Sequence, residues 1–314
     1  MHDHHHDHAH AVANSRPIFW AVAITLGFSL VESGVGWWAN SLALMGDAGH
    51  MLTDAAALGI AAFATWVSGR PASNRHTYGF ARAELVAAFV NSLFMLGIIA
   101  AIAWAAVDRL RAPLSVAGEA VTAVALLGLI VNLLVARLLH NDRRADGAGA
   151  DLNRRAAFLH VLGDLLGSVA AIAAGLIVTF TGWSWADPLL SLAICVLILF
   201  SSVSLVRQAL HGLMDGTPLS LDLAQVGRTL AGTAGVRSVH DLHVWSLNSA
   251  RMVLTAHVVV DDLAVWPEVL ARLKHATHAN FGIDHATFQP EPMNSPLLFM
   301  ARTVQVPTSR HSGE

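Results

Sequence analysis

Six long apolar stretches occupy the first two thirds of the chain, and they restrict its possible folds more than any other feature. Each approaches or exceeds the ~20 residues that a helix needs to cross a bilayer. Because backbone polar groups in lipid must hydrogen-bond within their own segment, we expect six transmembrane helices. They run roughly over Ile18–Trp38, Leu42–Val67, Leu85–Val107, Val116–Leu139, Ala156–Phe180 and Pro188–Leu210.

The composition agrees with a membrane protein and excludes several other classes. Hydrophobic residues make up 54% of the 314 residues and charged residues only 13%, which is too apolar for an ordinary soluble domain. The net charge of −3 gives no basic field, so nucleic acid is not an expected partner. Cys195, the single cysteine, lies in an apolar run and is expected to be buried and structural. The N-terminus does not have the pattern of a cleavable signal peptide.

The placement of arginine predicts the orientation of the helices. On one side of the membrane, arginines lie before the first stretch, between the second and third, between the fourth and fifth, and at the end of the sixth. The opposite side carries only Arg109 and Arg111. The positive-inside rule then puts both termini in the cytoplasm, with the helices in the inner (cytoplasmic) membrane. The residues on the inner side are Arg16, Arg70, Arg75, Arg82, Arg137, Arg143, Arg144, Arg154, Arg155 and Arg207.

Polarity rises after Leu213, and the pattern there predicts a small α+β domain in the order αββαβ. The expected elements are a helix at Leu221–Leu230, strands at Val239–Leu247 and Met252–Val260, a helix at Trp266–Asn280 capped by Asp262, and a strand at His285–Gln289. The predicted organisation is a His-rich disordered tail at 1–15, a six-helix transmembrane domain at 16–212, the cytoplasmic domain at 213–294 and a disordered tail at 295–314.

Two His-x-x-x-Asp pairs lie within the apolar stretches, His50 with Asp54 and His160 with Asp164. A spacing of four puts both side chains of a pair on one helix face. A charged group at the centre of a membrane helix costs about 2.5–3.5 kcal/mol on an insertion scale, so such groups are usually functional. If the two helices face each other, they present two imidazoles and two carboxylates, a set suited to Zn²⁺, Co²⁺ or Cd²⁺. The alternative is that each pair only ties its helix to a neighbour by hydrogen bonds.

Other polar residues in the stretches receive supporting roles. Asp47 lies three residues before His50 and is interpreted as an outer-shell or pore-lining group. We interpret Glu32, Asn91 and Asn132 as interhelical hydrogen-bonding groups. The two His/Asp pairs match in depth only if the fifth helix begins on the cytoplasmic side, before Ala156.

A metal site built from histidine and carboxylate also binds protons. Histidine titrates near neutral pH, and it binds metal only in its neutral form. One site therefore holds either metal or protons, which permits antiport by alternating access.

Five motifs now point to a known family. They are the stretch from Ser41 to Asp54, His76-Thr-Tyr-Gly-Phe-Ala-Arg-Ala-Glu84, His160-Val-Leu-Gly-Asp164, Asp187-Pro-Leu-Leu190 and His240-Asp-Leu-His-Val-Trp245. In this order, from about Pro17 to Glu291, the chain resembles the cation diffusion facilitator family, in its zinc-transporting branch of the bacterial zinc, cadmium and cobalt efflux type.

The resemblance implies a fold, a site and an assembly. It implies six transmembrane helices and a metallochaperone-like cytoplasmic domain, assembled as a homodimer in the lipid bilayer. The family's transport site matches His50, Asp54, His160 and Asp164, and a histidine at the first of these positions favours zinc as substrate. The resemblance also suggests a charge pair between Arg82 and Asp215, at the joint between the two domains. Arg82 alone could instead be an interfacial snorkelling residue.

One family site is expected to be absent or weakened. Certain members bind a second metal between the second and third helices through two histidines four residues apart. Here the first matches His76, but Phe80 occupies the second position. His76 is therefore interpreted as a hydrogen-bonding residue of the loop.

The cytoplasmic domain carries further histidines. His240 and His257 resemble metal ligands of the family, and Glu291, with Asp284 or His285, falls near the remaining ligand positions. Since side chains alternate along a strand, His243 is predicted to lie on the opposite face from His240. The alternative interpretation is solvated or core histidines on a small sheet. The tract from His2 to His10 suits loose capture of zinc.

These observations support one leading function and two alternatives. The leading hypothesis is a secondary transporter, not an enzyme, that exports zinc from the cytoplasm in exchange for protons, with cadmium and cobalt as possible substrates. An intramembrane metalloenzyme would need a motif such as His-Glu-x-x-His, which the sequence lacks. A membrane-embedded metal sensor or scaffold would bind metal in the soluble domain without flux.

Overall fold

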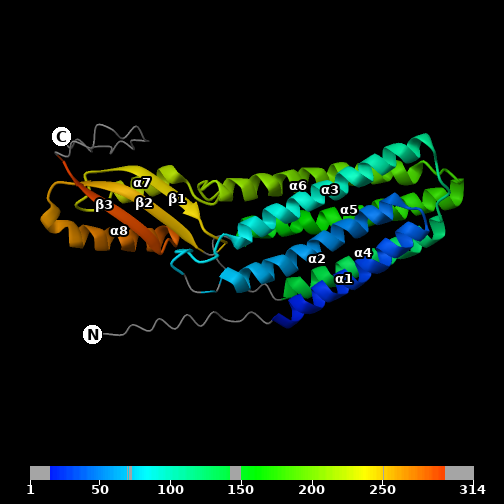
Figure 1. Ribbon diagram of the computed structural model, residues 1–314, viewed down its shortest axis with the longest axis horizontal. Helices are drawn as coiled ribbons and strands as arrows, with labels where there is room; N and C mark the ends of the chain where they lie inside the picture. Colours follow the sequence, from blue (N-terminus) through cyan, green and yellow to red (C-terminus); the bar gives the residue numbers. More distant parts are fainter. Residues whose placement is uncertain (1–14, 69, 71–72, 142–149, 250, 294–314) are drawn as a thin grey trace. The chain divides into compact units, whose positions relative to one another are not determined.

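The computed structural model describes residues 15–68, 70, 73–141, 150–249 and 251–293 (Figure 1). The predicted tail at 295–314 lies outside these residues, as does the predicted tail at 1–15 except for Ser15. The described residues form two compact units, one within 1–59 and 91–203 and the other within 60–90 and 204–314. Each unit is described by itself.

Six long helices appear in the predicted order, which confirms a helical membrane domain. Three described segments, Ala83–Arg111, Gly118–Arg137 and Ala186–Leu213, are long and apolar enough to cross a membrane by length and composition, and Val22–Trp38 and Leu165–Thr181 are shorter apolar segments. The six helices are α1 (Ser15–Trp38), α2 (Leu42–Ser68), α3 (Ala83–Arg111), α4 (Gly118–Asn141), α5 (Ala150–Thr181) and α6 (Ala186–Leu213).

Small residues bring α4 and α5 into close contact. A Cβ atom added to Gly118 would lie 2.6 Å from the carbonyl oxygen of Gly175, and one added to Gly175 would lie 2.8 Å from the carbonyl oxygen of Gly118. Further along, the Asn132 amide on α4 donates to the Ser168 hydroxyl on α5 at 3.4 Å. Residues early in α4 thus contact residues late in α5, so the two helices are antiparallel, and glycine permits their close approach.

The direction of α2 follows from two further contacts. The Ala117 amide, just before the start of α4, donates to the Ala39 carbonyl, just after the end of α1, at 3.1 Å. Further along α4, a Cβ added to Gly128 would lie 3.6 Å from Glu32, which is earlier in α1. Helices α1 and α4 are therefore antiparallel. The short link between α1 and α2 makes these two antiparallel as well. It follows that α2 is parallel to α4 and antiparallel to α5.

The core of the first unit is built from small and aliphatic side chains, and it includes Cys195, which is buried as predicted. Close packing of such side chains excludes voids and holds the helices in register. The buried members are Ala43, Leu44, Met95, Ile99, Ala125, Ala171, Ala174, Ile194, Cys195 and Ile198.

The C-terminal part of the second unit has the predicted αββαβ order. Its elements are α7 (Leu223–Ala231), β1 (Ser238–Ser246), β2 (Met252–Val260), the short 3₁₀ helix η1 (Leu263–Val265), α8 (Trp266–Phe281) and β3 (His285–Pro292). The sheet order is β1-β2-β3, with β1 antiparallel and β3 parallel to β2. A parallel neighbour requires a crossover connection, and α8 provides it.

One face of this sheet carries the hydrophobic core. Helices α7 and α8 bury Val226, Leu230, Val269 and Leu273 against the inward-facing residues of β2, which include Leu254. Alternate residues of each strand point to the other face, and the histidines lie there. Asp262 was predicted to cap α8, but it caps η1 instead, where its carboxylate accepts a hydrogen bond from the Ala264 amide at 2.8 Å.

Candidate metal centres

The first His/Asp pair lies on one face of α2, as its spacing of four residues requires. The His50 Nδ1 atom lies 3.6 Å from the Asp54 Oδ2 atom. Between them, the buried Thr53 hydroxyl donates to the His50 carbonyl oxygen at 2.7 Å. The same hydroxyl lies 3.6 Å from the sulfur of Met95 on α3. A side chain that contacts the backbone of its own helix and a neighbouring helix restrains the rotation of α2 at this level.

The second pair, His160 and Asp164, lies on α5, and the helical backbone puts the two residues on one face as well. Their side chains lie outside the part of the chain whose side chains the structure describes. The helix begins at Ala150. This start lies before Ala156, as the predicted match in depth between the two pairs requires of the helix boundary.

Asp47 connects α2 to α5 close to both pairs. Its carboxylate is 1% exposed and accepts a hydrogen bond from the Ser168 hydroxyl at 3.1 Å. A Cβ on the neighbouring Gly167 would lie 2.8 Å from the Asp47 Oδ1 atom. Asn132 donates to the same Ser168 hydroxyl, so the interhelical role predicted for Asn132 agrees with this contact.

Glu32 does not have the interhelical hydrogen bond expected from the sequence. Its side chain is completely buried on α1, and neither carboxylate oxygen has a hydrogen-bond partner among the described residues. The expectation rested on the usual behaviour of polar groups in membrane helices.

Asp187, at the start of α6, has a role that the sequence did not reveal. Its carboxylate accepts hydrogen bonds from the Ser41 hydroxyl at 2.5 Å and from the backbone amides of Leu42 at 2.7 Å and Ala43 at 3.4 Å. These amides belong to the first turn of α2 and have no partner within their own helix. Asp187 thus caps α2 from another helix, 145 residues away. Ser41 and Asp187 each occur in a motif quoted from the sequence, but the sequence does not show that they are in contact.

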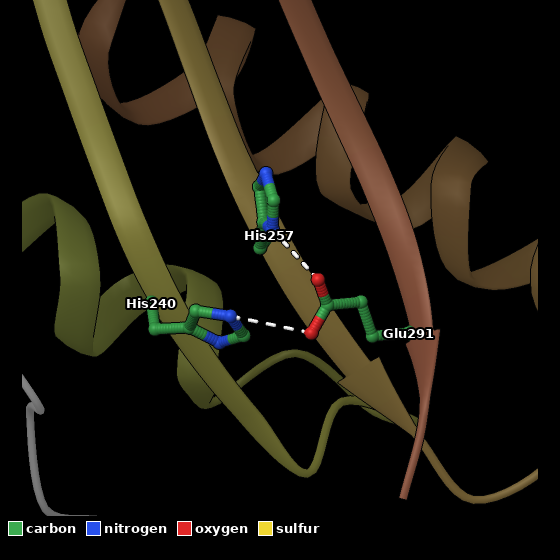
Figure 2. A group of neighbouring side chains, drawn as sticks. All are labelled: His240, His257 and Glu291. Atoms are coloured by element: carbon green, nitrogen blue, oxygen red, sulfur yellow. Dashed lines mark hydrogen bonds and ion pairs between the residues drawn. The ribbon is translucent and has the colours of Figure 1, made fainter. Parts of the chain in front are cut away.

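A second cluster of possible ligands lies on the sheet of the C-terminal domain (Figure 2). The His257 Nδ1 atom lies 2.7 Å from one oxygen of Glu291, and the His240 Nε2 atom lies 3.3 Å from the other. One ligand atom from each of the three residues lies within 4.8 Å of the other two. His240 is 8% exposed and Glu291 is 3% exposed. Two imidazole nitrogens and one carboxylate oxygen fit Zn²⁺, and they leave a fourth position open.

The strand register explains why these three residues meet. His240 of β1 lies directly opposite His257 of β2, and residues directly opposite share a face. Glu291 of β3 lies opposite Val259, which is two residues after His257 and therefore on the same face.

The prediction that His243 lies on the opposite face from His240 was wrong. The register shifts between these two residues, and His243 lies opposite Thr255, which shares a face with His257. The intervening Asp241 has a positive φ of 49°, so a β-bulge breaks the alternation. His243 pairs with Asp241 at 3.0 Å and is exposed.

Asp284 and His285 do not join the cluster. The Asp284 carboxylate instead lies 2.6 Å from the Nδ1 atom of His278. The ring of His285 packs edge-on against Tyr78, with the ring centroids 5.9 Å apart.

Within the second unit, the Arg82 guanidinium donates to the Asp215 carboxylate. The pair suggested by the resemblance is thus in contact, although both side chains are partly exposed. His76 lies in the loop before it and stacks on Phe80, with the ring centroids 4.6 Å apart. The phenyl ring of Phe80 has no nitrogen lone pair with which to bind a metal, so this position offers a single ligand.

Comparisons with known proteins agree with this architecture. The model of the cation efflux transmembrane domain matches residues 18–214, and the model of the cation efflux protein cytoplasmic domain matches residues 218–293. The zinc transporter ZitB of Escherichia coli is 42% identical over 92% of this chain and 92% of its own length. The cadmium, cobalt and zinc/H⁺-K⁺ antiporter of Bacillus subtilis is 37% identical over 89% of each chain. A solved structure, the metal-bound C-terminal domain of the CzcD transporter from Cupriavidus metallidurans, is 48% identical, covers 23% of this chain and 99% of its own, and has a TM-score of 0.21. The two family models together cover nearly all of the described chain, and the chain therefore belongs to the cation efflux, or cation diffusion facilitator, family of membrane transporters.

Proposed function

We propose that the protein exports divalent metal, zinc above all, from the cytoplasm across the inner membrane in exchange for protons. The relatives described as a zinc transporter and as a cadmium, cobalt and zinc/H⁺-K⁺ antiporter support this substrate class and the coupling to protons. The proposed transport site consists of His50, Asp54, His160 and Asp164.

The observation that carries this site is the contact between Asp47 and Ser168. Because α2 and α5 are antiparallel, moving forward from Asp47 and backward from Ser168 leads in the same direction. At a rise of about 1.5 Å per residue, His50 lies about 4.5 Å and Asp164 about 6 Å from this contact. By the same arithmetic Asp54 lies about 10.5 Å and His160 about 12 Å from it. The two pairs thus occupy the same levels on adjacent helices.

The chemistry of this set suits exchange of metal for protons. Zinc requires neutral imidazoles and ionised carboxylates, so binding it releases protons from the site. A site that is accessible from one side of the membrane at a time then carries metal one way and protons the other. The arginine distribution supports cytoplasmic termini, which would put metal entry on the side of the C-terminal domain.

The C-terminal domain, taken as residues 213–294 after a transmembrane domain at 16–212, supplies the second proposed site. His240, His257 and Glu291 would bind zinc there as a resident ion, with the fourth position open to water or another ligand. Within a homodimer, the exposed pair of Arg82 and Asp215 would connect the end of the membrane helices to this domain.

Flux through the membrane domain tests the proposal. The purified protein is placed in proteoliposomes that contain a zinc-sensitive dye, and a pH gradient is imposed. The gradient should drive zinc entry in the wild type, and either His50→Ala or His160→Ala should reduce it to the rate of empty vesicles. Glu119→Gln, at an exposed acidic position on α4, is the matched control and should retain flux. Unchanged flux in His160→Ala would refute the proposed site.

The cluster on the sheet favours a second candidate function, a membrane-anchored metal sensor. A sensor would bind zinc through His240, His257 and Glu291 but would pass no zinc through the membrane. The same assay separates the two, because a sensor gives zinc binding with no flux in any variant.

A further inference from the structure

Glu32 on α1 is a buried acidic residue that the proposed transport site does not use. Its side chain has no exposed surface, and both carboxylate oxygens lack a hydrogen-bond partner among the described residues. A Cβ added to Gly128 of α4 would lie 3.6 Å from the Glu32 Oε1 atom and 3.0 Å from the ring of Phe28, which is one turn before Glu32 on α1.

A second carboxylate interacts electrostatically with Glu32. Glu32 lies within electrostatic range of Asp47, which is itself 1% exposed. The packing of α1 on α2 agrees, since an added Cβ on Gly36 would meet the Met45 side chain at 3.0 Å. Glu32 lies four residues before Gly36 on α1, and Gly49 lies four residues after Met45 on the antiparallel α2. Glu32 therefore lies near the level of Gly49, two residues beyond Asp47.

Among the described residues of α1, α2 and α4, no lysine or arginine lies near Glu32. On α4 the charged residues Glu119 and Arg137 each lie nine positions from Gly128, about 13.5 Å along the helix. On α1 the other charged residue is Arg16, four turns away. On α2 the groups beyond Asp47 are His50 and Asp54, which belong to the proposed metal site.

A carboxylate in such surroundings is not stable in its ionised form. Transfer of an ionised carboxylate out of water without hydrogen bonds or a counter-ion is so unfavourable that the group takes up a proton instead. A second carboxylate nearby adds repulsion in the same direction, because two adjacent carboxylates do not both ionise readily. Asp47 has the Ser168 hydroxyl as a hydrogen-bond donor and Glu32 has none among the described residues, which favours Glu32 as the group that holds the proton.

We propose that Glu32 is a proton-binding site of the membrane domain, separate from the four metal-ligand residues, and that it releases its proton when a divalent cation occupies the α2 pair. Two positive charges placed at His50, one helical turn from Asp47, attract the carboxylates of both Asp47 and Glu32 and favour their ionised forms. Glu32 thus contributes one proton to the exchange without touching the metal. This role in coupling rests on the proposed transport function, whereas the proton on Glu32 in the metal-free protein does not.

Infrared difference spectroscopy on the full-length protein in lipid tests the proton directly. At neutral pH, without metal, the wild type should show the carbonyl band of a protonated carboxylic acid, and this band should disappear when zinc is added. Glu32→Gln keeps the size of the side chain but cannot titrate, and it should lack the band. Glu32→Asp should retain the band at a shifted frequency. Glu119→Gln should leave the band unchanged.

A count of protons tests the coupling. In weakly buffered solution with a pH-sensitive dye, zinc binding to Glu32→Gln should release one proton fewer per zinc than binding to the wild type or Glu119→Gln. A band that persists in Glu32→Gln together with an unchanged proton count would overturn the proposal. So would the absence of any protonated carboxyl band from the metal-free wild type, a result that needs no variant to fold. If zinc fails to bind the wild type, the transport proposal fails, while titration of the band with alkali still shows whether Glu32 carries the proton.

Discussion

At the scale of single residues, the C-terminal cluster depends on one carboxylate. Glu291 is almost fully buried and contacts two imidazoles through its two oxygens. His257 is a hydrogen-bond partner of one Glu291 oxygen, whereas the other oxygen has only the ion-pair contact with His240 among the described residues. The proposed zinc site thus depends on Glu291, the residue that contacts both histidines.

Glu291→Gln should weaken zinc binding in the C-terminal domain. The amide lacks the negative charge that metal ligation uses, so the affinity should fall at least about tenfold, the smaller of the losses seen even for outer-shell partners. Titration calorimetry on the full-length protein would measure the loss. Asp284→Asn, in the exposed pair with His278, is the matched control. Wild-type affinity and stoichiometry in Glu291→Gln would contradict the assignment.

Zinc affinity at both proposed sites should depend on pH in one direction. Each site contains two histidines, which bind metal only when neutral, so affinity is full above the histidine range near pH 6.5 and falls as the pH drops through it. Well below this range, two displaced protons raise the apparent Kd by up to about 100-fold per pH unit. Calorimetry from about pH 5.5 to 7.5 spans the transition. An affinity that does not change over this range would exclude histidine ligation.

At the scale of elements, contacts between helices fix the levels of the ligand residues. Asp187 caps the start of α2, Ser168 contacts Asp47, and two facing glycines set the separation of α4 and α5. In the C-terminal domain the bulge at Asp241 places His243 on the face of His257. In each case a residue outside the proposed sites fixes the position of a neighbouring helix or side chain.

Gly118→Ala should separate α4 from α5 and destabilise the membrane domain. The new methyl group would clash with the backbone of Gly175, and such overpacking costs about 1–3 kcal/mol. The thermal unfolding midpoint in detergent should fall accordingly. Gly27→Ala on α1 is the control, because no atom lies within 4 Å of its added Cβ. Equal midpoints for the two variants would show that the α4–α5 contact does not require glycine.

At the scale of the whole molecule, the sequence predicted the features that depend on local pattern. The six long helices follow from apolar length, and the αββαβ order follows from alternation and turn residues. The prediction failed where two distant segments meet. Alternation along β1 put His243 on the wrong face, because the bulge depends on pairing with β2. The isolation of Glu32 depends on what α2 and α4 present to it. The capping of α2 by Asp187 joins residues that no local pattern relates.

The central claim is that His50, Asp54, His160 and Asp164 form one site. The direct test is the zinc content of purified full-length protein in a background where the His2–His10 tract is removed and Glu291 is replaced by Gln. One zinc ion per chain should remain in this background. Either His50→Ala or His160→Ala should abolish zinc binding, and the double variant should show the same loss as each single variant. Two separate sites would instead lose zinc independently, so retention of wild-type zinc binding in either single variant would contradict the account.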